Sequence, residues 1–166
     1  GSDVVVLGLD DLYQFNFALD YEYDVETFER ELEQADFAEK NEERLTRLLR
    51  AARLDHGDFL PEIDAEGALV ERERLKRRCL DGLVSAANLA LDLNRPEQAL
   101  QSCQAALNID PSLEEAYRLA MRGYDAEGNR AGVIRQYQAC IQAMKQEFGT
   151  APSQQTVHLF ELLTRQ

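Results

Sequence analysis

The stretch that decides the fold is PEQALQSCQAALNIDPSLEEAYRLAMRGYDAEGNRAGVIRQYQACIQAM, residues 96–144. Its apolar residues recur every three or four positions, which is the spacing that buries one face of a helix. Pro111 and Gly128 interrupt this pattern, as residues that end helices do. The stretch therefore predicts three consecutive helices joined by short turns.

This stretch lies within a longer segment, residues 80–147, that repeats at a spacing of 34 residues. Within 96–144, apolar positions of the first helix align with those of the third helix: Ala99 with Val133, Cys103 with Tyr137, Ala106 with Cys140, and Leu107 with Ile141. A helix–turn–helix period of 34 residues is typical of tetratricopeptide repeats. A generic helical bundle is the alternative that this pattern leaves open.

Turn and cap residues set the predicted boundaries of these helices. Pro96 stands at the start of the first helix, a position that suits proline. Residues 112–115 (SLEE) have the form of a capping box. Asn129 is predicted to cap the next helix and Gly149 to end it, and Pro152-Ser153 is predicted to open a short last helix.

The helical pattern continues upstream of residue 96. It predicts a long helix over 68–92, a connecting loop over 55–67, a helix that Asn41 caps, and a helix from residue 25. The predicted buried positions of these helices are Val25, Phe28, Leu32, Ala35, Leu45, Leu48, Leu49, Ala52, Leu80, Leu83, Val84, Ala87 and Leu91. In the later helices we also expect Ile134, Met144, Val157, Phe160 and Leu163 to face inward.

Residues 4–19 follow a different pattern. Apolar side chains alternate with polar ones on either side of Asp10 and Asp11, which predicts a short β-hairpin. We therefore expect an all-α fold of about seven helices in tetratricopeptide-like hairpins, preceded by this β-hairpin.

The charge of the chain restricts its partners. There are 18 basic and 31 acidic residues, a net charge of −13, which repels nucleic acid phosphates and anionic membranes. Three cysteines and no recognisable signal peptide favour a reducing, cytoplasmic setting. Gly1 and Ser2 resemble a cloning remnant, so we expect Asp3 to begin a piece of a longer protein.

Little in the sequence points to chemistry. The two histidines, His56 and His158, lie far apart and in no metal-binding spacing. The cysteines and the tyrosines at helical spacing fit core positions better than reactive ones. We therefore expect no catalytic residue, no metal and no cofactor.

Several short motifs, in this order, carry a resemblance to a known family. They are Gly57-Asp58-Phe59-Leu60, Glu71-Arg72 with Leu75, Asp110-Pro111, Glu114-Glu115-Ala116 with Arg118, Gly128-Asn129-Arg130, Tyr137, Gly149 with Pro152-Ser153, and Leu159. Over about residues 22–163 the chain resembles the bacterial transcriptional activator domain. That domain occurs in SARP-type antibiotic regulators and in large ATPase-linked regulators. One departure is Leu69, because the family often has a tryptophan before the VERER stretch.

The resemblance implies an organisation and a function. Residues 1–20 would be the remaining wing hairpin of a winged-helix DNA-binding domain that lies upstream, and residues 21–166 the activator domain. The implied function is regulation and oligomerisation through protein–protein contact, without enzymatic activity. Its partners would be the DNA-binding domain of the same chain, a second copy, or the transcription machinery. A stand-alone peptide-binding scaffold is the alternative.

Two surfaces are candidates for these contacts. In tetratricopeptide arrays the first helix of each pair lines a groove, which by register would hold Asp81, Val84, Asn88, Glu115, Arg118 and Arg122. The second surface is the basic stretch 70–78, where Arg72, Arg74 and Arg77 could dock on acidic residues. We expect the acidic partner to be residues 20–43 of the same chain, which hold 11 acids and two bases.

Overall fold

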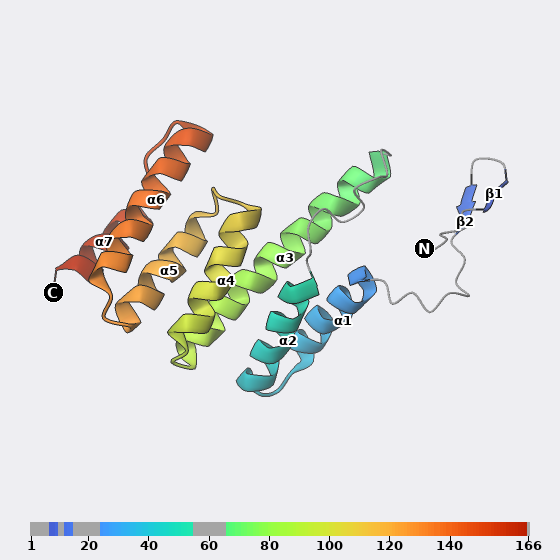
Figure 1. Ribbon diagram of the computed structural model, residues 1–166, viewed down its shortest axis with the longest axis horizontal. Coiled ribbons are helices and arrows are strands. Elements are labelled where there is room, and N and C mark those ends of the chain that lie inside the picture. The colour runs from blue at the N-terminus through green and yellow to red at the C-terminus, as the bar shows by residue number, and fades with distance from the viewer. Residues whose placement is uncertain (1–6, 10–11, 15–23, 55–65, 166) are drawn as a thin grey trace, which may run out of the picture.

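A computed structural model describes residues 7–9, 12–14, 24–54 and 66–165 of the protein (Figure 1). These residues form seven helices: α1 (Asp24–Phe37), α2 (Asn41–Leu54), α3 (Glu66–Asp92), α4 (Pro96–Ile109), α5 (Glu114–Ala126), α6 (Arg130–Phe148) and α7 (Gln154–Thr164). None of the described helices combines the length and the apolar character that crossing a membrane requires. The body of the described chain is therefore all-helical, as predicted.

Two strands of three residues each precede the helices. They are β1 (Leu7–Leu9) and β2 (Leu12–Gln14), which pair antiparallel with Leu7 opposite Gln14. The other residues of the predicted 4–19 hairpin lie outside the described part of the chain. The hairpin as a whole, and its identity as a wing, remain predictions.

The helices stand side by side as antiparallel hairpins (Figure 1). The most extensive contacts join α1 to α2, α3 to α4, α4 to α5 and α5 to α6, and α7 packs on both α5 and α6. Each hairpin thus contacts mainly its neighbours in sequence, which is the arrangement of a helical-repeat protein.

Small residues form the centre of this row. Ala86, Ala87 and Ala90 of α3 and Ala99 of α4 are at most 1% exposed. Helix axes approach more closely where the side chains at the contact are small. The alanines therefore explain why α3 and α4 make the most extensive contact in the described chain.

Most predicted helix ends are confirmed. Pro96 begins α4, and the side chains of Asn129 and Ser153 accept hydrogen bonds from the Gly132 and Thr156 amides. Gly149 ends α6 with a φ of 66°, a left-handed conformation that glycine adopts without steric cost. Asn41 is the first residue of α2 rather than its cap, and α3 begins at Glu66 rather than residue 68.

The predicted capping box is wrong. The Asp110 carboxylate accepts hydrogen bonds from the Ser112 amide (2.8 Å) and hydroxyl (2.7 Å). This local turn takes the serine hydroxyl away from the helix, and α5 begins at Glu114 without a side-chain cap. Aspartate and the amide two residues later commonly form such turns, which compete with capping.

The buried positions largely follow the predicted stripes, with shifts of one residue. Phe28, Leu32 and Ala35 are buried as predicted. In α2, Ala51 is buried in place of Ala52, which is half-buried. Ile134 was predicted to face inward but is exposed. In α3, Leu80, Val84 and Leu91 are only half-buried, and the fully buried stripe is Leu75, Cys79, Leu83, Ala86, Ala87 and Ala90.

Candidate protein-interaction surfaces

The acidic helix α1 is held to α3 by ion pairs. Glu29 accepts hydrogen bonds from Arg74 (2.7 Å) and Arg78 (2.8 Å) of α3. Arg74 also donates through Nε to Glu71 in its own helix at 2.9 Å. The hydrogen bond from Arg74 holds the pKa of Glu71 below its ordinary value, and Glu71 and Glu29 raise the pKa of Arg74.

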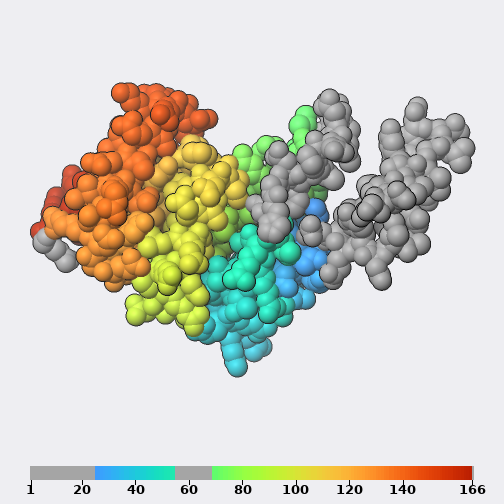
Figure 2. Space-filling model, viewed as in Figure 1, coloured from blue at the N-terminus to red at the C-terminus, as the bar shows by residue number. Residues whose placement is uncertain are grey.

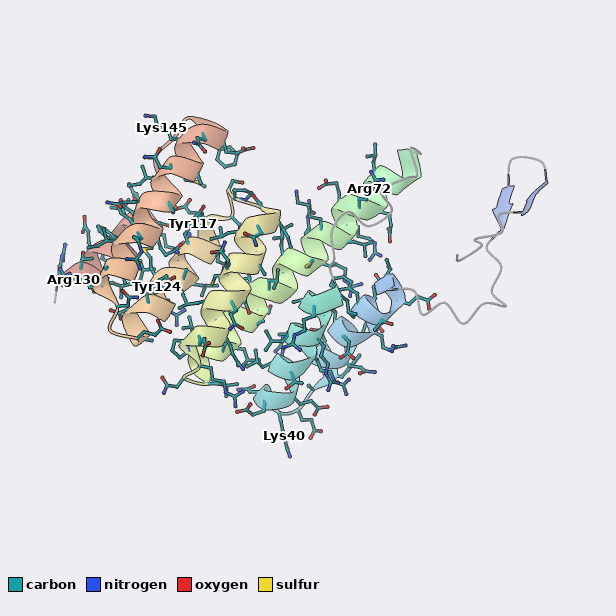
Figure 3. The ribbon with its side chains drawn as sticks, in the orientation of Figure 1. Lys40, Arg72, Tyr117, Tyr124, Arg130 and Lys145 are labelled. Atoms are coloured by element: carbon teal, nitrogen blue, oxygen red, sulfur yellow. The ribbon has the colours of Figure 1, made fainter. Side chains whose placement is uncertain are left out.

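The structure places the three predicted docking arginines differently from one another. Arg74 contacts α1 directly, whereas Arg72 is half-buried near the N-terminal end of α3 (Figure 3). Arg77 is exposed and forms no ion pair within the described residues. Arg78 belongs to the predicted basic stretch but was not among the three arginines singled out, although it lies four residues after Arg74 and therefore on the same side of the helix. That these contacts serve docking in the functional sense remains a proposal.

Two further ion pairs tie α2 to its neighbours. Arg47 of α2 lies 3.2 Å from Glu31 of α1, and both side chains are largely buried at 27% and 13% exposure. Arg95, just before α4, lies 2.7 Å from Glu42 at the start of α2. Part of the negative charge of α1 is thus neutralised by basic residues of the same chain.

The six predicted groove residues have unlike environments. Asp81, Glu115 and Arg122 are exposed on α3 and α5, two helices that pack against each other. Val84 packs against the core. The Asn88 amide donates to the Val84 carbonyl at 3.2 Å, so one of its two amide hydrogens is already used.

Arg118, the sixth of these residues, contacts α7. Its Nη1 atom donates to the Thr156 hydroxyl at 3.1 Å and lies 3.9 Å from Glu114. Glu114 accepts from the amide (2.8 Å) and the hydroxyl (2.7 Å) of Ser153, the cap of α7. These four residues form a polar latch between α5 and α7.

The latch combines burial with charge. Thr156 is fully buried, and its hydroxyl is satisfied by Arg118. Burial raises the pKa of Glu114. Hydrogen bonds from Thr156 and Ser153 and the charge of Arg118 lower that pKa by more than burial raises it, so the pKa lies below its ordinary value. Sequence reasoning missed Thr156, because a polar side chain that follows two glutamines carries no signal of burial.

A small hollow opens between α1, α2 and α3. Its volume is about 160 Å³, and it is lined by Leu32, Asp36, Arg44, Leu48, Arg78, Asp81, Gly82 and Ser85. Two carboxylates and two guanidinium groups share its rim, so the hollow has no preference for ligands of one charge. Asp81 is the only predicted groove residue among these lining residues.

The cysteines and tyrosines, which could in principle take part in chemistry, are packed into the fold. Cys103 and Cys140 are buried, which raises the pKa of each thiol to about 12, so the thiols stay protonated and unreactive at neutral pH. Tyr117 is buried and donates to the Pro111 carbonyl, and Tyr137 stacks on Phe160. His158 is exposed, and His56 lies outside the described residues. Within the described residues, no three His, Cys, Asp or Glu side chains are grouped as metal ligands.

Comparison with known proteins identifies the family. A search of curated proteins finds no match to this chain. The sequence pattern of the family described as "Bacterial transcriptional activator domain" matches residues 23–163. This range covers all seven described helices except for Thr164, the last residue of α7. The chain belongs to the bacterial transcriptional activator domain family.

Proposed function

We propose that this protein is the regulatory and oligomerisation module of a bacterial transcriptional regulator and acts by protein–protein contact. The observation that carries the proposal is the family match over residues 23–163. The arrangement of the helices supports it, because a row of helical hairpins presents long exposed helix faces to other proteins. The net charge of −13 supports it further, since this chain would contact DNA unfavourably.

In this proposal the DNA-binding part is a winged-helix domain upstream of Asp3. The partners are that domain, a second copy, or the transcription machinery, and the protein works in the cytoplasm. The predicted groove (Asp81, Val84, Asn88, Glu115, Arg118 and Arg122) and the basic residues Arg72, Arg74 and Arg77 are candidate contact residues. Because Arg118 and Arg74 are engaged within the chain, the exposed Arg122 and Arg77 are the better candidates for contacts with a partner.

The test compares this chain with the full-length regulator. The full-length protein should bind its promoter duplex at physiological salt, and this chain alone should not shift the same duplex. Removing residues 24–165 from the full-length protein should abolish activation of a reporter gene while the remaining DNA-binding domain still binds. Tight binding of duplex DNA by the isolated chain, or full activation without residues 24–165, would overturn the proposal.

The alternative, a stand-alone peptide-binding scaffold, gains no support from a specific observation. The family match links the chain to transcriptional regulators. A gene sequence without a helix-turn-helix pattern directly before Asp3 would favour the scaffold.

A further inference from the structure

The hollow between α1, α2 and α3 lies where the first helical hairpin meets the third helix (Figure 1). Leu32 of α1 and Leu48 of α2 line it, and both are buried, at 8% and 5% exposure. Gly82 of α3 also lines it, and a Cβ atom at this glycine would lie 3.1 Å from Cδ2 of Leu32. The hollow therefore combines apolar walls with a position at which the chain supplies no side chain.

Several polar groups that line the hollow are not fully used within the described part of the chain. There, the Asp81 carboxylate and the Ser85 hydroxyl have neither an ion pair nor a hydrogen bond. Arg44 lies 3.9 Å from Asp36, which is longer than a hydrogen bond. Arg78 donates to α1 through Nη1, which leaves other N–H groups of its guanidinium for a ligand.

The volume of the hollow limits the size of a ligand. At about 160 Å³, it exceeds the roughly 10–15 Å³ that one water molecule needs. It is smaller than the roughly 300–1,000 Å³ of sites for drug-sized molecules. A single small metabolite fits this range, whereas a nucleotide does not.

The charges around the hollow select a ligand that carries both signs. A guanidinium group donates paired hydrogen bonds to a carboxylate, and a carboxylate accepts hydrogen bonds from an ammonium group. A simple anion would be repelled by the two aspartates and a simple cation by the two arginines. A free amino acid carries an ammonium and a carboxylate group on one carbon atom. From these observations we propose that the hollow binds a free α-amino acid with an aliphatic side chain.

Each part of the ligand has its counterpart in the hollow. Arg44 and Arg78 hold the carboxylate, Asp36 and Asp81 hold the ammonium group, and the two leucines contact the aliphatic side chain. Because these residues come from α1, α2 and α3, the ligand joins the first hairpin to α3. The inference goes beyond the proposed function, since it adds a small-molecule site to a protein proposed to act by protein–protein contact.

An NMR titration of the isotope-labelled chain with L-leucine tests the inference. A ligand this small binds weakly, so we expect saturable chemical-shift changes with a Kd of about 0.1–10 mM. The changes should concentrate at the residues that line the hollow. L-leucinamide lacks the carboxylate and N-acetyl-L-leucine lacks the ammonium group. Each should bind at least about tenfold more weakly, because it leaves one pair of protein charges without a partner.

Variants of the hollow have matched controls in the same chain. Asp81→Asn and Arg44→Gln should each weaken the binding of L-leucine by about fivefold or more, because each removes a charge that holds the ligand. Asp125→Asn and Arg50→Gln remove the same charges at exposed positions that do not line the hollow, and they should bind as the wild type does. Circular dichroism would establish that all four variants keep their helices.

Four outcomes would overturn the inference. They are the absence of saturable changes up to about 10 mM L-leucine, changes confined to other helices, equal binding of the two blocked derivatives, and equal weakening in the control variants. Such a failure leaves the proposed function standing, because the reporter and DNA-binding experiments compare the presence and absence of residues 24–165 and not of a ligand.

Discussion

Gly132, in the first turn of α6, lies against the ring of Tyr124 in α5. A Cβ atom at this position would lie 2.5 Å from the Cγ and Cδ1 ring atoms of Tyr124 and 3.0 Å from the Cβ of Tyr124. These atoms lie at the base of the side chain, so the tyrosine cannot move aside without displacing α5. The close approach of α5 and α6 therefore depends on glycine at position 132.

We expect Gly132→Ala to destabilise the protein by about 1–3 kcal/mol, the usual cost of overpacking a core. Thermal or urea unfolding followed by circular dichroism would measure the change. Gly123→Ala is the matched control: its Cβ would meet the Leu100 side chain at 3.0 Å, and the flexible leucine end can shift. Equal stability of Gly132→Ala and the wild type would contradict this account of the α5–α6 contact.

Glu114 should stabilise the docking of α7 in a pH-dependent way. The pKa of Glu114 is lowered from its ordinary 4.5 in the folded chain. Its contribution is therefore complete above that value and is lost as the pH falls through the folded pKa. We expect Glu114→Gln to cost about 1–2 kcal/mol at neutral pH, the scale of a hydrogen bond to a charged group.

The difference between the wild type and Glu114→Gln should shrink toward zero as the pH falls below 4.5 and through the lowered pKa of Glu114. Urea unfolding at a series of pH values would show it. Glu115→Gln is the control, because Glu115 is exposed one residue away. A difference between wild type and Glu114→Gln that stays constant with pH would show that the carboxylate charge does not hold α7.

The contact between Arg118 and Thr156 could not be predicted from the sequence. Periodicity placed Arg118 on the predicted groove face, but its partner stands 38 residues later in the chain. A contact over that distance leaves no local pattern in the sequence. The buried positions of α1, by contrast, follow from spacing alone, because large apolar side chains dominate the burial of that helix.

At the scale of elements, ion pairs determine how α1 lies on α3. Replacing both Arg74 and Arg78 by glutamate would put two new carboxylates beside the carboxylate of Glu29. We expect the double variant to lose about 1–2 kcal/mol of unfolding free energy, because partly exposed pairs are worth little and repulsion adds to their loss. Its stability should also rise with added salt, which screens that repulsion.

Arg77→Glu is the control for this experiment, because Arg77 is exposed and forms no ion pair among the described residues. It should change the stability by less than about 0.5 kcal/mol. Restoring a positive charge opposite the reversed arginines, with Glu29→Arg, should recover part of the loss. No recovery in the triple variant would indicate that the pairs do not position α1.

The presence of the helices could be predicted because the spacing of apolar residues and the positions of the cap residues agree in this chain. The predictions failed where two local structures compete for the same atoms. The Ser112 hydroxyl could cap α5 or donate a hydrogen bond to Asp110, and in the structure it donates to Asp110. Likewise, the period alone could not distinguish Ala51 from Ala52, since either lies close to the buried stripe of α2.

For the whole molecule, the distribution of the core predicts uneven stability. One apolar cluster extends continuously through α1, α2, α3, α4 and α5. A second, smaller cluster joins α5 to α6 through Tyr117, Cys140 and Met144. Figure 2 shows α6 and α7 at one end of the row, with α3 and α4 between that end and α1 and α2. The end with α7 therefore has fewer buried contacts than the middle.

Hydrogen exchange should follow this distribution, because in repeat proteins each unit is stabilised chiefly by its neighbours. We expect amides of α3 and α4 to exchange only through global unfolding. Amides of α7 should exchange through local opening that costs at least about 2 kcal/mol less. The variant Glu114→Gln should speed exchange in α7 and leave α3 unchanged, because the latch contacts only α5 and α7. Uniform protection of all helices would mean that the row unfolds as one unit, and that the polar latch couples α7 to the main core as firmly as apolar packing does.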